Sequence, residues 1–390
     1  MDLALPMRSW ADALATAVSG IALFDAHTHI GHNDPDGMSQ TPAELIEMLG
    51  AAGALGAFTF PMHEPDGYPN ANDTVLQAAT ATDGLLVAFC RVNPNTGDAP
   101  AEAIRVLDAG ARGIKLHPRA EQFTLDHPAV RELAAIAHER RLPILIHAGR
   151  GIPALGAHAV QIAADFPDAR LILAHAGVCD LSWIWREAAD HPNLLFDTSW
   201  WMPSDLQALF ALVPPGQILF ASDAPYGHTL GSAVTQLRCA LQVGLSPTQI
   251  RCIASEQSLR IAAGEPLVPC GPPVGERERA PHLLLDRVAE YILLGAIATM
   301  RGADGGPEML ALARQACDVP DEIDDAPVFA AVRSLLNEFD HAQAAEPENR
   351  RRLGFLILAA SVARTPDVPL PAPAPAPASA PAQTTVSTER

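Results

Sequence analysis

Short apolar runs recur along the first two thirds of the chain, and each is followed by a stretch with apolar residues at helical spacing. A run that is apolar throughout, without polar alternation, is typical of a parallel strand that is buried on both faces. The pattern predicts strands at Leu23–Ile30, Ala57–Pro61, Leu85–Asn93, Gly113–His117, Ile144–His147, Leu171–His175, Leu194–Asp197 and Ile218–Ser222.

The segments between these runs carry the start and stop signals of helices. Thr41 before Pro42 is a typical N-cap, and Gly110 and Pro143 mark helix ends. Eight strand–helix units within about 250 residues predict an α/β fold, a (β/α)8 TIM barrel, over residues 1–263. A doubly wound open sheet is the alternative. It would need a Gly-rich phosphate loop after an early strand, and the sequence has none there.

The pattern changes after a last barrel helix at Pro247–Ala263. Residues 264–281 are rich in Pro and Gly and predict a linker. Residues 282–364 have helical spacing and no cluster of candidate ligands, so they predict an all-helical region packed on the barrel or on a partner. Residues 365–390 contain Pro-Ala repeats, which predict an extended, disordered tail.

The chain has 390 residues and a net charge of -19, from 26 basic and 45 acidic residues. This balance argues against a nucleic-acid or anionic-membrane partner. No apolar run reaches the length of a membrane span, and the N-terminus lacks the order of a signal peptide. The six cysteines form no CxxC pair, so they are predicted to be reduced thiols in a cytoplasmic protein. The composition is compatible with a homo-oligomer.

Polar side chains of a few kinds stand at the ends of the predicted strands. His27 and His29 end the first strand two residues apart, so they share a face. In a barrel the same rim receives residues from the other strands, here Lys115, His117, His147, His175 and Asp223. Neutral imidazoles with a carboxylate suit Zn²⁺, with Mn²⁺, Fe²⁺ and Co²⁺ as alternatives, so the sequence predicts a divalent metal centre.

Lys115 is the only lysine in the chain, and the other 25 of the 26 basic residues are arginine. A lone lysine in an arginine-rich chain is expected where arginine cannot replace it, because the two side chains differ in geometry and in the ease of losing a proton. Its place at the end of a predicted strand makes it a candidate for chemistry.

Six motifs, DAHTHIG, RVNP, RGIKLHP, LPILIHAG, LILAHAG and LFASDAPYG, fall in order on successive predicted strands. The series resembles the amidohydrolase superfamily, and more closely its branch of metal-dependent hydrolases that also contains non-oxidative decarboxylases. The resemblance covers residues 21–263. It implies a divalent metal held by His27, His29, His147 and Asp223. It makes His175 either a ligand or the residue that orients and polarises the substrate.

The resemblance leaves two roles for Lys115. In binuclear members of the superfamily, a lysine on strand four is carboxylated and bridges two metals. The branch with GIKLHP resembles a mononuclear type, in which Lys115 stays a cation aimed at a substrate carboxylate or oxyanion. The mononuclear interpretation is favoured, with His117 either at the substrate or as a hydrogen-bonding partner behind a ligand.

Loops on the same rim supply candidate substrate contacts, namely His117, Arg150, Trp200 and Trp201. An arginine such as Arg150 could bind a carboxylate. The adjacent tryptophans could stack on a planar substrate, or could cap the barrel mouth against the C-terminal helices. The predicted partner is a small molecule, a carboxylate or an aromatic compound.

The favoured function is a metal-dependent hydrolase that activates a water to attack an amide, ester or lactone carbonyl. Asp223 would shuttle the proton, and His175 and Lys115 would stabilise the oxyanion. The alternative is a metal-dependent lyase, a non-oxidative decarboxylase or hydratase of an aromatic or unsaturated acid. A third hypothesis is a barrel that only binds a partner, and the intact set of rim residues argues against it. Specificity loops carry no readable code for the substrate.

Overall fold

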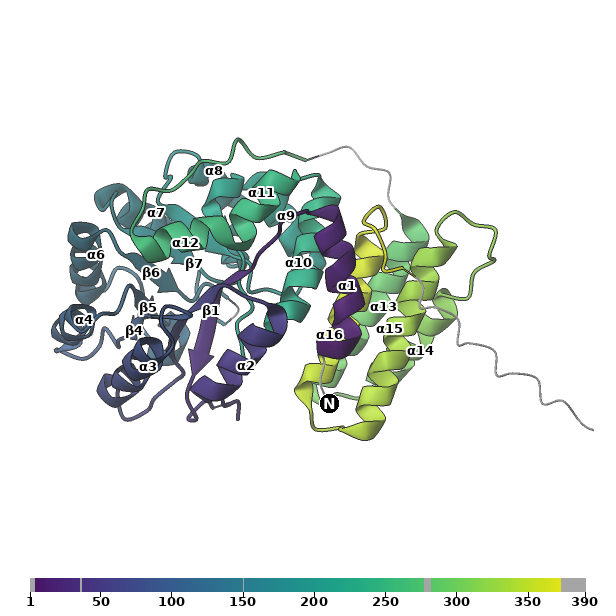
Figure 1. Cartoon of the computed structure of the whole chain (residues 1–390), viewed down its shortest axis with the longest axis horizontal. Coiled ribbons are helices and arrows are strands. Elements are labelled where there is room, and N and C mark those ends of the chain that lie inside the picture. The colour runs from purple at the N-terminus through teal and green to yellow at the C-terminus, as the bar shows by residue number, and fades with distance from the viewer. Residues whose placement is uncertain (1–3, 36, 150, 277–281, 373–390) are drawn as a thin grey trace, which may run out of the picture.

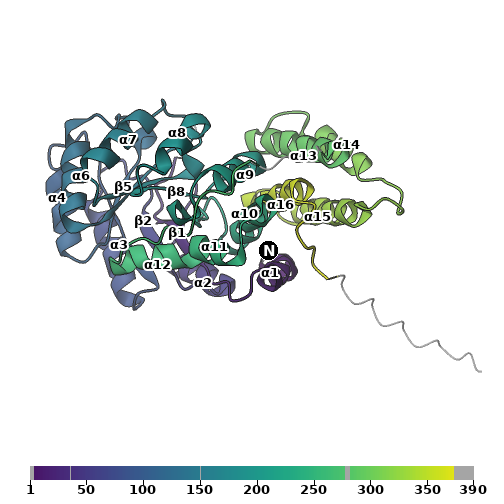
Figure 2. The ribbon, with the colours of Figure 1, turned by 90° about the horizontal axis from the view of Figure 1, so that it is seen from above.

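The computed structural model describes residues 4–35, 37–149, 151–276 and 282–372. A barrel formed by the earlier part of the chain and a group of C-terminal helices lie beside each other along the long axis (Figure 1). Seen from above, α9 and α10 lie where the two parts meet (Figure 2).

Parallel strands form the barrel wall in sequence order. They are β1 (Phe24–Ile30), β2 (Gly56–Pro61), β3 (Leu86–Ala88), β4 (Cys90–Arg91), β5 (Ile114–Leu116), β6 (Pro143–Ile146), β7 (Arg170–Leu173), β8 (Leu194–Asp197) and β9 (Ile218–Leu219). β3 and β4 are two halves of one strand, joined by Phe89, whose N–H donates to the Thr59 carbonyl at 2.9 Å. At the other junction, Ala26 N–H donates to the Phe220 carbonyl at 2.9 Å. The predicted TIM barrel and its strand positions are confirmed.

Helices cover the outside of this wall, as the helical spacing predicts. They are α2 (Pro42–Ala52), α3 (Pro69–Ala81), α4 (Ala99–Asp108), α6 (Pro128–Arg140), α7 (Gly156–Asp165), α8 (Leu181–Ala188), α9 (Pro203–Leu212), α10 (Thr229–Val243), α11 (Pro247–Arg251) and α12 (Gln257–Ala263). The short helix α5 (Pro118–Glu121) follows the end of β5 directly. The helix predicted at Pro247–Ala263 is interrupted by a π-helical turn over Cys252–Glu256. Among the described helices, none combines the length and the apolar character needed to cross a membrane.

Aromatic side chains fill the inside of the barrel. Phe24, Phe58, Phe60 and Phe89 are all buried in an interior cluster, and the ring centroids of Phe24 and Phe58 lie 4.9 Å apart. This packing makes the barrel a filled core rather than a pore. The polar site therefore has room only at the rim.

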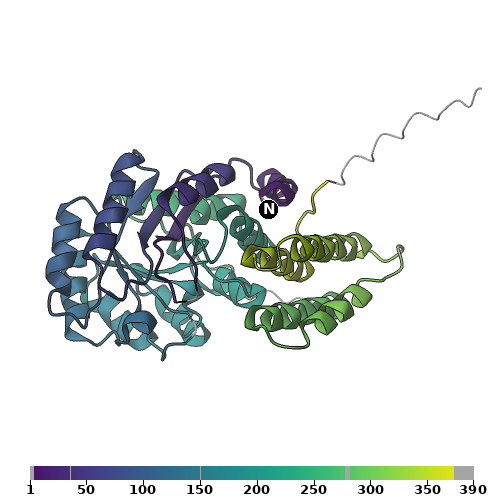
Figure 3. The same cartoon turned by 90° about the horizontal axis from the view of Figure 1, so that it is seen from below.

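The C-terminal region is helical, as its pattern predicts. Its helices are α13 (Leu283–Arg301), α14 (Gly306–Ala316), α15 (Ala326–Ala345) and α16 (Leu353–Arg364). Its apolar core includes Leu230 and Val234 of the barrel helix α10 and Trp10 of the N-terminal helix α1 (Ala4–Ala17). Figure 3 shows these helices together from below. They pack on the barrel through α10, and α1 joins that contact.

Buried Arg238 on α10 binds the segment that follows α16. Its guanidinium donates to the carbonyls of Thr365, Val368 and Pro369 at 3.2, 3.3 and 2.7 Å, and it lies 5.3 Å from the Trp10 ring centre. Packing therefore continues at least to Pro369, beyond the predicted start of the tail at residue 365. Residues 373–390 lie outside the described residues.

Replacing Arg238 by methionine is expected to lower the free energy of unfolding by about 2–4 kcal/mol, because three buried or half-buried carbonyls lose a charged donor. Urea unfolding measures the change. Arg333→Met on α15 is the matched control, because Arg333 is exposed and its effect should stay below about 0.5 kcal/mol. Equal stability of the two variants would show that the segment after α16 does not depend on Arg238.

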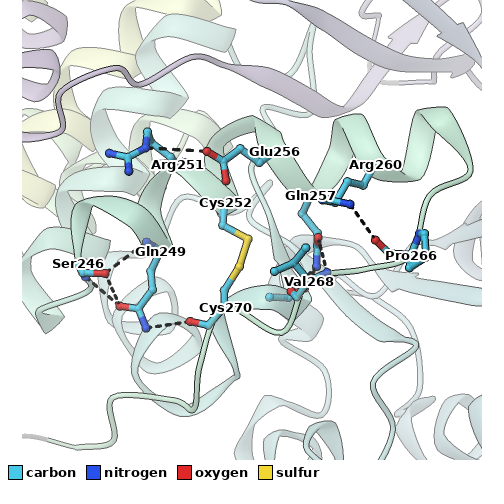
Figure 4. Close-up of a disulfide and its surroundings, with 11 residues drawn as sticks. Ser246, Gln249, Arg251, Cys252, Glu256, Gln257, Arg260, Pro266, Val268 and Cys270 are labelled. Atoms are coloured by element: carbon cyan, nitrogen blue, oxygen red, sulfur yellow. Dashed lines mark hydrogen bonds and ion pairs between the residues drawn. A yellow bond between two sulfur atoms is a disulfide. The ribbon is translucent and has the colours of Figure 1, made fainter.

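Cys252 and Cys270 form a disulfide, which contradicts the prediction that all six cysteines are reduced (Figure 4). They are separated by 18 residues and match no motif. They meet because the chain after α12 turns back over α11, where Gln249 Nε2 donates to the Cys270 carbonyl at 3.3 Å. Disulfides are rare in reducing compartments, so the cysteines no longer support the predicted cytoplasmic location.

Candidate metal centre

β1 carries two histidines to the rim of the barrel. The pairing register of β1 with β2 shifts within residues 25–28, and such an irregularity re-aims the side chains beside it. The rings of His27 and His29 both pack on Phe60, at centroid distances of 5.1 and 4.6 Å. Both imidazoles therefore lie directly above the aromatic interior.

Asp223 completes a triangle of ligand atoms with these histidines. His27 Nε2 lies 3.1 Å from His29 Nε2, and Asp223 Oδ1 lies 3.1 Å from each of them. Ligands at Zn–N distances of about 2.0 Å in a tetrahedron are separated by about 3.3 Å, so the spacing suits a small divalent cation. Two imidazoles and a carboxylate are also the donor types that zinc and similar metals take. The residues present therefore fit a metal.

Asp25 joins β1 to the loop that carries Asp223. Its carboxylate accepts the N–H of Ser222 at 2.9 Å and the hydroxyl of Thr229 at 2.8 Å. Complete burial raises the pKa of Asp25 to about 6 despite these hydrogen bonds.

Asp223 itself has a φ of 60°, a conformation that a non-glycine residue adopts at a cost of about 1–3 kcal/mol. Such strain is typical of functional positions.

The electrostatics of the triangle keep Asp223 ionised. Burial raises the pKa of Asp223, but the charges and hydrogen bonds of His27, His29 and His175 together outweigh burial and hold that pKa well below its usual range. Burial lowers the pKa of His29 to about 3. Burial and Lys115 lower the pKa of His27, but Asp223 and Asp197 raise it further, so that it ends above its usual value. The site thus offers an anionic oxygen and a neutral imidazole.

Lys115 reaches the same group from β5. Its Nζ lies 3.3 Å from His27 Nε2 and 4.5 Å from the ring centre of Phe60, and the residue is fully buried. Burial lowers the pKa of Lys115 to about 7, although Asp223 opposes that shift. The single lysine of the chain therefore stands beside the candidate ligands, as its strand position predicts.

His147, the fourth predicted ligand, is adjacent to the triangle but is not one of the three residues whose ligand atoms lie within 4.8 Å of one another. Its Nδ1 lies 3.0 Å from His175 Nε2, and its buried Nε2 has no hydrogen-bond partner. His117 stacks on His147 with a centroid distance of 3.9 Å. The ring of His175 lies 5.3 Å from that of His27. The histidines of β1, β5, β6 and β7 therefore form one connected group.

Asp197, the last residue of β8, is a site residue that the sequence analysis missed. Its Oδ2 accepts from His27 Nδ1 at 2.8 Å, and its Oδ1 accepts from the backbone N–H groups of His175 and Ser199, both at 3.0 Å. It is fully buried. Its position at the rim end of a predicted strand is the signal that could have identified it.

A second unpredicted feature is a buried ion pair beside Lys115. Arg91 Nη2 donates to Glu121 Oε1 at 2.6 Å, and the Tyr68 hydroxyl donates to the same oxygen. Arg91 also stacks over Tyr68, 5.0 Å from its ring centre. Because breaking a buried pair is costly, this contact holds α5 and the loop before α3 against the rim.

The predicted substrate contacts lie at different distances from the triangle. The ring of Trp200 lies 6.2 Å from that of His175, and its Nε1 donates to Asp205 at 2.7 Å. Trp201 lies one ring further away, 6.0 Å from Trp200. Arg150 lies outside the described residues. Trp200 therefore lies beside His175, and Trp201 lies beside Trp200.

Solved structures with the same fold include a TIM-barrel protein from Bordetella bronchiseptica, 17% identical with a TM-score of 0.52, covering 63% of this chain and 99% of that one. A 2,6-dihydroxybenzoate decarboxylase from Rhizobium is 14% identical with a TM-score of 0.50, covering 62% and 99%. At these identities the likeness establishes the fold alone. Among curated protein sequences, none matches this chain.

The family model described as Amidohydrolase matches residues 24–259, which is more than half of the chain. The matched region begins at β1 with the two histidines and includes Asp223 and every barrel strand. Members of this family are metal-dependent enzymes, and the His27, His29 and Asp223 triangle is a candidate metal site of that kind. The chain is therefore a member of the amidohydrolase family built on a TIM barrel.

Proposed function

We propose that the protein is a metal-dependent hydrolase that uses an activated water to attack an amide, ester or lactone carbonyl. The observation that carries this proposal is the convergence of His27 Nε2, His29 Nε2 and Asp223 Oδ1 at separations of 3.1 Å. A bound divalent cation, with Zn²⁺ favoured over Mn²⁺, Fe²⁺ and Co²⁺, supplies Lewis-acid activation of water and carbonyl. His147 is the proposed fourth ligand.

The residues around this triangle have distinct proposed roles. Asp223 holds the proton taken from water and passes it to the leaving group, since its low pKa keeps it ionised. Lys115 faces the oxygen that becomes negative during attack, because its Nζ borders the ligand atoms. Both ring nitrogens of His175 have partners, so we assign His175 to positioning rather than to the oxyanion.

The lyase alternative is supported by one observation, the Trp200 ring beside His175. An aromatic surface at a metal site suits a planar acid, the substrate of a non-oxidative decarboxylase or hydratase. The substrate in either case is proposed to be a small carboxylate or aromatic molecule.

A substrate panel decides between the two reactions. Protein loaded with Zn²⁺ or Mn²⁺ is given esters, lactones and amides, and separately aryl and unsaturated carboxylic acids with detection of CO₂ release or hydration. Hydrolysis that disappears in Asp223→Asn supports the proposal. If the carboxylic acids release CO₂ or add water, and no ester, lactone or amide is hydrolysed, the protein is a lyase and the hydrolase proposal is wrong. Protein that binds no metal and acts on neither panel would favour a binding module.

A further inference from the structure

We propose that Asp197 and Ser199 are positioning residues that set the protonated nitrogen of three histidines on other strands. The starting observation is Asp197 Oδ2, which lies 2.8 Å from His27 Nδ1. The Asp197 carboxylate already accepts hydrogen bonds from N–H and O–H groups, and an ionised carboxylate has no hydrogen to donate. His27 Nδ1 therefore carries the hydrogen of this contact. In the neutral ring His27 Nε2 is then the nitrogen with the lone pair, and it lies 3.1 Å from His29 Nε2 and from Asp223 Oδ1.

Ser199 acts in the same way on His175. Its backbone carbonyl lies 2.8 Å from His175 Nδ1, and a carbonyl can only accept. His175 Nδ1 therefore carries the hydrogen, and in the neutral ring Nε2 is an acceptor. The Ser199 hydroxyl donates to Asp197 Oδ1 at 2.5 Å, which fixes the serine to the same carboxylate.

The effect passes from His175 to His147. Because His175 Nε2 accepts, the neighbouring His147 Nδ1 at 3.0 Å must donate. His147 Nε2 is then unprotonated, and it is the buried nitrogen that has no hydrogen-bond partner. Asp197 at the end of β8 and Ser199 after it thus place hydrogen on Nδ1 of two predicted ligands, His27 and His147, and leave Nε2 as the ligand atom of each neutral ring. The orientation of metal-binding imidazoles by such outer contacts is a general requirement of metal sites.

The hydrogens on Nδ1 follow from the hydrogen bonds alone, whereas their consequence for metal binding rests on the proposed function. The first experiment therefore uses metal-free wild-type protein with ¹⁵N-labelled histidine, and two-bond ¹H–¹⁵N spectra assign the protonated nitrogen of each ring. We expect hydrogen on Nδ1 of His27, His175 and His147. Hydrogen missing from Nδ1 of any of these three rings, or present on Nε2 of His147, overturns the inference, whatever the protein does with metal.

The second experiment measures Zn²⁺ affinity in Asp197→Asn by competition with a chelating dye. The asparagine amide can donate toward His27 Nδ1, which would move the hydrogen to Nε2 and block the ligand atom. We expect affinity to fall by about 10- to 100-fold, and a change of less than about twofold overturns the inference. Asp180→Asn is the control, because buried Asp180 accepts the N–H groups of Leu155 and Gly156 but touches none of these histidines.

The two experiments separate the inference from the proposed function. If the wild-type protein binds no Zn²⁺, the proposed function is contradicted, and the spectra still decide which nitrogens carry hydrogen. If Asp197→Asn does not fold, the wild-type spectra decide the inference without it. The inference and the proposed function are both supported if the wild-type spectra show the expected tautomers and Zn²⁺ binding weakens in Asp197→Asn but not in Asp180→Asn.

Discussion

Replacing Asp223 by asparagine is expected to weaken Zn²⁺ binding by about 1,000-fold, or about 4 kcal/mol, and to remove the activity. The carboxylate oxygen lies 3.1 Å from the Nε2 atoms of His27 and His29, and it is the only charged oxygen in that triangle. An amide oxygen of the same shape keeps the volume but loses the charge that attracts the cation. It also loses the base that takes the proton.

Metal content after dialysis and the shift of the melting temperature with added Zn²⁺ measure this effect. A ligand that binds only the folded state at 100 times its Kd adds about 2.7 kcal/mol of stability, and Asp223→Asn should lose this gain. Asp165→Asn on α7 is the control, because Asp165 pairs with Arg131 on the outer surface. Wild-type affinity in Asp223→Asn would place the ion away from the triangle.

Replacing Lys115 by methionine is expected to lower kcat/KM by about 100- to 1,000-fold without weakening Zn²⁺ binding, since one preformed oxyanion contact is lost. The pKa of Lys115 is lowered to about 7, so the wild-type activity should fall as pH rises above 7 and the ammonium loses its proton. Unchanged kcat/KM in Lys115→Met would exclude the cationic role. An activity that requires bicarbonate, and loses that requirement in the variant, would favour the carboxylated lysine.

The same variant should change the pH dependence of stability in metal-free protein. Between pH 7 and 10.5 the unfolded chain holds the Lys115 proton that the folded chain has released. The unfolding free energy of the wild type therefore rises with pH across this window. Below pH 7 both states hold the proton, and the cost of the buried ammonium is fully present. Lys115→Met should lack this slope and be more stable near pH 7, which urea unfolding at several pH values can measure.

Much of the site was accessible from the sequence because barrel strands deliver their last residues to one rim. Spacing placed His27 and His29 together, and strand order brought Asp223 and Lys115 to them. Asp197 was overlooked although it also ends a strand, since a single Asp beside apolar residues carries no distinctive pattern. The Arg91 and Glu121 pair joins the end of β4 to the end of α5, two elements distant in sequence, so no local signal marks it.

Apolar runs and helical spacing determined the barrel, its strand positions and the C-terminal helices. Burial on one or two faces of an element requires apolar residues at regular spacing, and this spacing can be seen in the sequence. Only the tertiary structure decided which contacts form between residues that belong to no such pattern. These are the Cys252–Cys270 disulfide, the binding of the post-α16 segment by Arg238, and the carboxylate of Asp197 behind His27. Each depends on the three-dimensional meeting of single polar or sulfur atoms, and hydrophobic periodicity contains no information about such meetings.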